Sequence, residues 1–274
     1  MTTNTIRVGD VVLTRVGYAD IGIDPARVGL TPEQVEAVPW AEPMWAAGNE
    51  VRAGAAVWVI QDSDARIAVD PAQAADEIIR SDDDAALHQE AFAALLEAAG
   101  MPRESFTHAI MTHVEGIGMW AWRNDDGSWV PFFPNASIMV PQRELDAIDR
   151  GEHPSPPHPA FTQLRALGVL KPVTDGDRAT ANVSLEHAGA HTPGHQFVRI
   201  SSGGEQAVMV GHLAVTPLHL VTGPCPQQHP RPAEAQLRIE ALLEEDAVLI
   251  GPLWPTPGAG RWDGGKLVAV AASS

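Results

Sequence analysis

The sequence predicts an α/β fold in a single domain that spans residues 1–274. Residues 65–70 and 108–113 are short β-rich runs, and the helical pattern of residues 84–99 lies between them. A chain of 274 residues with 45% hydrophobic and 19% charged side chains can bury a full core. Because no long linker interrupts the hydrophobic pattern, we expect one domain.

The chain opens with β structure. Residues 6–16 alternate apolar and polar side chains with a period of two, which predicts a strand with one buried face. Residues 55–61 and 65–70 are β-rich and flank a polar turn, as in a hairpin. Further strands are predicted over residues 137–140 and 248–251 and in the runs LEHAGA, FVRISS and AVMVGHLAV.

Three segments have helical character. Residues 84–99 space their large apolar side chains helically, and Gly100 follows as a C-cap glycine would. Residues 141–150 place Pro141 in the first turn of a second helix. Residues 232–247 combine strong helix formers with apolar spacing and predict a third helix.

Residues 20–50 lose all periodicity and contain four prolines beside Trp40, Met44 and Trp45. We interpret this segment as an extended N-terminal arm whose apolar side chains need a surface to cover. That surface is either the parent domain or a second subunit, so the arm also predicts a homo- or hetero-oligomer.

The charge of the chain limits its partners. A formal net charge of −17 repels a phosphate backbone, which argues against nucleic acid. No apolar run approaches the ~20 residues that a membrane-spanning helix needs. The start of the chain lacks the features of a signal peptide, and the single Cys225 excludes an internal disulfide. We therefore expect a cytoplasmic protein that acts on a small molecule.

Histidines gather where predicted strands end. Three motifs follow or close a strand: THVEG (112–116), HTPGH (191–195) and VGH (210–212). Loops on a rigid sheet commonly carry functional groups, and neutral imidazoles are good ligands for metals. His113 and Glu115 are one residue apart and can bend toward one point, where His195 and His212 would complete a metal site.

These motifs resemble the metallo-β-lactamase superfamily, in particular its lactonases and organophosphate hydrolases. In that family a strand ends in T-H-x-H-x-D-H, a later loop reads TPGHTPGH, another strand ends in G-D, and the last ends in G-T-H-F-P. This chain has THVEGIG, HAGAHTPGH, VGH and GPLWP in the same order. The resemblance covers nearly the whole chain and implies a four-layer αββα sandwich.

The resemblance also implies a degenerate metal site. His113, Glu115 and His195 stand at first-metal positions, and His212 replaces the bridging aspartate as a fourth ligand. Gly116, Ile117 and Leu253 fall in the second-metal motifs, and none of these side chains can bind a metal. We therefore expect at most one divalent metal, with zinc ahead of iron or manganese, or no metal at all.

The function implied is a hydrolase for a small apolar ester, lactone, aryl ether or related electrophile, with Glu115 or His212 as metal ligand or base. Trp120, Trp122, His219 and Trp254 are candidate pocket residues, and structural packing is the alternative for each. One alternative function is a non-catalytic or supporting subunit of a heteromeric hydrolase built from homologous chains. Another is a mononuclear iron oxygenase or lyase on the same scaffold.

Overall fold

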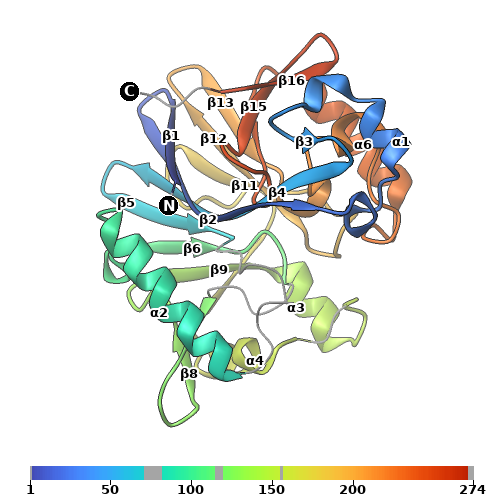
Figure 1. The fold of residues 1–274 in the computed structure, drawn as a ribbon. Helices are drawn as coiled ribbons and strands as arrows, with labels where there is room; N and C mark the ends of the chain where they lie inside the picture. Colours follow the sequence, from blue (N-terminus) through green and yellow to red (C-terminus); the bar gives the residue numbers. More distant parts are fainter. Residues whose placement is uncertain (1, 71–81, 115–119, 155–156, 271–274) are drawn as a thin grey trace.

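The computed structural model describes residues 2–70, 82–114, 120–154 and 157–270. Within them the chain forms an eight-stranded sheet, a six-stranded sheet and a separate two-stranded hairpin. Helices lie on both sides of the two stacked sheets (Figure 1). The predicted α/β class is confirmed.

The first sheet is mixed. Its strands are β1 (Thr2–Val8), β2 (Val11–Ile23), β4 (Glu50–Asp62), β5 (Ala65–Val69), β6 (His108–Ile110), β9 (Ser137–Pro141) and β10 (Leu170–Val173), in that spatial order, with β3 (Ala46–Ala47) paired to β4. The strands from β1 to β5 pair antiparallel. Strands β5, β6, β9 and β10 pair parallel, so the loops after β6 and β9 leave the same edge of the sheet.

The second sheet contains only later residues. Its spatial order follows the chain: β11 (Val183–His187), β12 (Gln196–Ser202), β13 (Glu205–Met209), β14 (Val248–Ile250), β15 (Ala259–Asp263) and β16 (Lys266–Ala269). Within the described residues, each sheet therefore comes from one continuous half of the chain.

Three apolar clusters separate four layers. One cluster lies between the two sheets and includes Leu13, Ile60, Val198 and Ile250. A second lies between the first sheet and the helices α2 (Asp82–Ala98), α3 (Gln142–Asp149) and α4 (Pro159–Ala166), together with the hairpin β7 (Ala121–Arg123) and β8 (Trp129–Pro131). A third lies between the second sheet and α1 (Pro32–Glu36), α5 (His219–Thr222) and α6 (Pro232–Leu243). The layers are thus helices, sheet, sheet and helices, as predicted.

The prediction of one strand over residues 6–16 was wrong, because this segment is a hairpin. Strand β1 ends at Val8 and β2 begins at Val11. Gly9 turns the chain with φ of +56°, a conformation that glycine adopts without steric cost. Apolar side chains are buried on both sides of the turn, so the alternation continues through it and conceals the reversal.

Residues 20–50 fold against their own domain. After β2, the segment forms the 3-10 helix η1 (Pro25–Val28), then α1, then the 3-10 helix η2 (Pro39–Ala41). Val35, Val38 and Trp45 are buried in the third cluster, and Trp45 meets the Trp254 ring edge to face at 6.1 Å. The buried part of this segment is therefore covered by the same chain.

The three predicted helices are present, although the third ends at Leu243 rather than at residue 247. Strand β6 stops at Ile110, so Thr112 and His113 belong to the loop that follows it. None of the helices in the described residues has the length and apolar character that crossing a membrane requires.

Candidate metal site

Three histidines meet where the two sheets adjoin. His113 lies after β6, His191 lies in the β11–β12 loop, and His212 lies in the 3-10 helix η5 (Gly211–Ala214) after β13. One ring nitrogen from each can be chosen so that all three atoms lie within 4.8 Å of one another. His113 and His191 are buried, and His212 is partly exposed.

The sequence around His113 fixes its tautomer. The Thr112 hydroxyl donates to Asp70 at 2.5 Å and lies 2.9 Å from Nδ1 of His113. Because the hydroxyl hydrogen is already used, Nδ1 of His113 must donate to the Thr112 oxygen. Nε2 of a neutral His113 then keeps its lone pair, as a metal ligand needs.

The tautomer of His191 is fixed in the same way, by a carbonyl from a later loop of the chain. Its Nδ1 lies 2.8 Å from the backbone oxygen of Gln228, which can only accept. Nδ1 therefore carries the hydrogen, and Nε2 of neutral His191 keeps its lone pair. Two of the three imidazoles thus offer Nε2 to the triad.

His195 lies beside the triad. Its ring centroid is 5.6 Å from those of His113 and His191, and its side chain is fully buried. Neither ring nitrogen has a hydrogen-bond partner in the part of the chain that the structure describes. Burial, followed by the neighbouring His113 and His191 rings, holds the pKa of His195 well below its ordinary value.

Glu144 ties the histidine loops together. This fully buried side chain of α3 accepts hydrogen bonds from the backbone amides of Val114 at 2.8 Å and Gly194 at 2.5 Å. Nε2 of His153 lies 2.9 Å from Oε2 of the same carboxylate. Burial alone would raise the pKa of Glu144, but the donated hydrogen bonds outweigh it and lower the pKa.

The chain shares its architecture with solved structures of hydrolases. The hydrolase AbOPH of the β-lactamase superfamily has a TM-score of 0.71 and 18% identity, covering 99% of this chain and 98% of its own. AidC, a dizinc quorum-quenching lactonase, has a TM-score of 0.70 and 18% identity with the same coverage. A probable metal-dependent hydrolase from Staphylococcus aureus has a TM-score of 0.73 and 16% identity, covering 98% of this chain and 99% of its own. This chain has the metallo-β-lactamase fold. No protein-family model and no curated protein matches its sequence.

On this metallo-β-lactamase scaffold, the donor set of the triad fits a divalent ion. Neutral imidazoles suit zinc and other late first-row metals, and three protein ligands leave a position open for chemistry. The unpartnered nitrogens of buried His195 are a further sign that a ligand belongs here, since buried polar atoms normally have partners. Within the described residues, no carboxylate belongs to the triad.

AidC is a dizinc lactonase, but the described residues of this chain offer few ligands for a second metal ion. Leu253, in the last motif, packs against the third apolar cluster and cannot bind a metal. At the position where the resemblance implies a bridging carboxylate, this chain has His212, and an imidazole cannot hold two ions as a carboxylate does. Gly116 and Ile117 lie outside the described residues.

The structure brings some of the predicted site residues together and places others elsewhere. His113 and His212 meet in the triad, His195 lies beside it, and Glu115 lies outside the described residues. Trp254 is fully buried and donates to the backbone oxygen of Ala214 at 2.8 Å.

The remaining pocket candidates also pack within the domain. His219 is fully buried with Nε2 2.9 Å from the backbone oxygen of Val28. Trp120 is buried in the second apolar cluster, and Trp122 packs against that cluster beneath Arg103.

Sequence reasoning gave His191 too little weight and did not single out His229 or Glu144. The motif HTPGH contains two histidines, and spacing alone does not tell which one turns toward His113. His229 is fully buried, with its ring centroid 5.4 Å from that of His191, but it stands in a loop without a recognisable motif. Glu144 is signalled only by its place in a helix after a strand.

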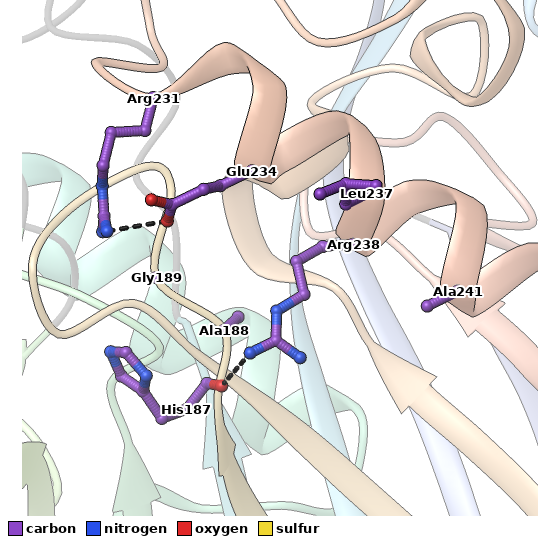
Figure 2. A pocket seen from close by; sticks show the side chains of 8 residues that line it. All are labelled: His187, Ala188, Gly189, Arg231, Glu234, Leu237, Arg238 and Ala241. Carbon is purple, nitrogen blue, oxygen red and sulfur yellow. Dashed lines mark hydrogen bonds and ion pairs between the residues drawn. The ribbon is translucent and has the colours of Figure 1, made fainter.

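A surface groove adjoins the β11–β12 loop but has different chemistry. It has a volume of 390 Å³ and lies between His187–Gly189 and α6 (Figure 2). Arg231 pairs with Glu234 at 2.7 Å, and Arg238 donates to the backbone oxygen of His187 at 3.3 Å. Because its charges are compensated and none of the triad lines it, we do not assign the reaction to this groove.

Proposed function

We propose that this chain is a metal-dependent hydrolase with a single-metal centre, acting on a small ester, lactone or related electrophile. The observation that carries the proposal is the triad of His113, His191 and His212, in which the tautomers of His113 and His191 are set for ligation. The hydrolases and lactonase that share the fold support the reaction class.

The protein residues have separate roles in this proposal. His113 and His191 hold the ion from buried positions, and Thr112 and the Gln228 carbonyl orient their rings. A divalent ion held here would supply Lewis acidity, the property that polarises a carbonyl and activates water. His212 is the partly exposed member of the triad, so the substrate approaches from its side.

Proton transfer in this proposal needs a general base. The sequence nominates Glu115 and His212 as ligand or base, and this assignment remains part of the proposal. This general base would take a proton from the attacking water and return it to the leaving oxygen. Aryl ethers are the less favoured substrates in this scheme, because they lack a carbonyl for the ion to polarise.

The test measures bound metal by mass spectrometry in the parent and in His113→Ala, with His108→Ala as the control. His108 lies on β6 outside the triad and bonds to Thr107. We expect about one ion per chain in the parent and in His108→Ala, and loss of the ion in His113→Ala. A parent without metal, or His113→Ala with the same content as the parent, would overturn the proposal.

Activity is then assayed on aryl esters and lactones with the metal-loaded parent. Turnover should disappear in His113→Ala and persist in His108→Ala. Equal turnover in both variants would mean that the triad does not carry the reaction.

A further inference from the structure

The buried carboxylate of Glu144 joins the two halves of the candidate metal site. Its oxygen Oε2 accepts from the amide of Val114, the residue after His113. Its oxygen Oε1 accepts from the amide of Gly194, the residue before His195 and three residues after His191. One side chain therefore bonds to both histidine loops, which leave different sheets.

Gly194 packs closely against Glu144. A Cβ atom on Gly194 would lie 2.6 Å from the backbone nitrogen of Glu144 and 2.8 Å from Oε1. Any side chain at position 194 would thus push the loop away from α3. The absence of a side chain at this position lets the backbone amide reach the carboxylate directly.

The carboxylate is also held in its charged form by its partners. His153 adds another hydrogen bond to the carboxylate, at Oε2, and the side chains of His153 and Glu144 are almost fully shielded from solvent. Glu144 stands in the first turn of α3, where the helix dipole favours negative charge. An ionised carboxylate only accepts hydrogen bonds, so it can satisfy both backbone amides at once.

We propose that Glu144 is a positioning residue for the metal centre: its carboxylate sets the separation of the His113 and His191 loops and so the geometry of the triad. This inference rests on the proposed function for the identity of the ligand. Glu144 belongs to none of the metal-ligand motifs, and it acts through Val114 and Gly194 rather than by touching the ion or the substrate.

The test compares Glu144→Gln with Asp62→Asn. Glutamine keeps the shape of the side chain, but its NH₂ group cannot accept from a backbone amide. Asp62 is the matched control, because it is another buried carboxylate with side-chain donors, Thr180 and Asn182, and lies outside the metal site. Each variant therefore replaces one buried carboxylate by the corresponding amide.

The first measurement is the affinity for Co²⁺, followed by its visible absorption and by competition with a chelator. We expect Glu144→Gln to bind about 10- to 100-fold more weakly than the parent, with an altered Co²⁺ spectrum, as loss of an outer partner of metal ligands does elsewhere. Asp62→Asn should bind as the parent does, even if it is less stable. Parent-like Co²⁺ affinity and spectrum in Glu144→Gln would overturn the positioning role.

The second measurement is hydrogen exchange at the amides of Val114 and Gly194 in metal-free protein. At least one of them should exchange about tenfold faster in Glu144→Gln, while both stay protected in Asp62→Asn. If the parent binds no Co²⁺, the proposed function fails, and exchange alone decides the bonding role of Glu144. Unchanged protection of both amides in Glu144→Gln would then overturn it.

Discussion

The hydroxyl oxygen of Thr112 lies 2.9 Å from Nδ1 of His113 while its hydrogen is donated to Asp70. The Asp70 carboxylate therefore decides, through Thr112, which nitrogen of His113 keeps a lone pair. Asp70 also accepts from the Thr112 amide at 2.8 Å, so both of its oxygens are committed to one residue.

Replacing Thr112 with valine should therefore weaken metal binding and lower stability. The change deprives His113 Nδ1 of its acceptor and one Asp70 oxygen of a donor, at a cost of about 1–3 kcal/mol. Metal affinity should fall about 10- to 100-fold, measured by chelator competition. Thr180→Val is the control, because it removes a similar hydroxyl–carboxylate bond, to Asp62. Equal affinities in the two variants would contradict the role of Thr112.

His191 and His195 should differ in what they contribute. His191 belongs to the triad, so His191→Ala should lose a ligand of the metal. Its metal affinity should therefore fall by more than the factor of about 10 to 100 that is typical for loss of an outer partner. His195→Ala should keep a stoichiometric ion with a smaller loss of affinity. Isothermal titration with Zn²⁺ gives both values, and the reverse order would show that His195 is the ligand.

Gly211 should not tolerate a side chain. Its φ is +55°, and a Cβ atom there would lie 2.4 Å from Nε2 of His195 and 2.9 Å from Oγ1 of Thr112. Gly264 has the same φ of +55° with open space around it. Gly264→Ala should cost about 1–2 kcal/mol from backbone strain, and Gly211→Ala about 1–3 kcal/mol more from overpacking. Urea unfolding measures both, and equal losses would rule out the predicted clash.

His219 should make stability depend on acid. Burial lowers its pKa from 6.5 to about 4. Between pH 6.5 and 4, His219 is protonated in the unfolded chain but neutral in the folded chain. The free energy of unfolding is therefore highest above pH 6.5 and falls as the pH drops toward 4. Over this pH range the loss in free energy of unfolding from His219 is about 3 kcal/mol.

His219→Gln can still donate to the Val28 carbonyl but has no charge to gain. Its unfolding free energy should fall less steeply between pH 6.5 and 4 than that of the parent. Urea unfolding at several pH values measures the slopes, with the comparison above pH 7 as the reference. Parallel slopes would contradict the prediction.

The main elements could be predicted because their patterns are local. Helical spacing of apolar side chains predicted α2, and two β-rich runs around a polar turn predicted the β4–β5 hairpin. Residues 20–50 could not be placed, because their burial depends on a surface formed by residues more than a hundred positions later.

The site was predictable only in part. Strand ends bring His113 and His212 together because the sheets fix where those strands stop. The choice of His191 depends on a loop that turns through Gly189 and Ala190, both at positive φ, and on a carbonyl 37 residues away. Glu144 escaped notice because its main partners are backbone amides, which any sequence possesses.

The two sheets divide the chain into consecutive halves, joined by the segment between Val173 and Val183. A cut in this linker would leave His113 on one fragment and both His191 and His212 on the other. Each fragment would keep one whole sheet, but α1, which packs against the second sheet, would stay with the first fragment, and neither fragment would hold a complete triad. The ion would then act as a cross-link between two pieces, making reassembly of the cut protein a direct sensor of the metal.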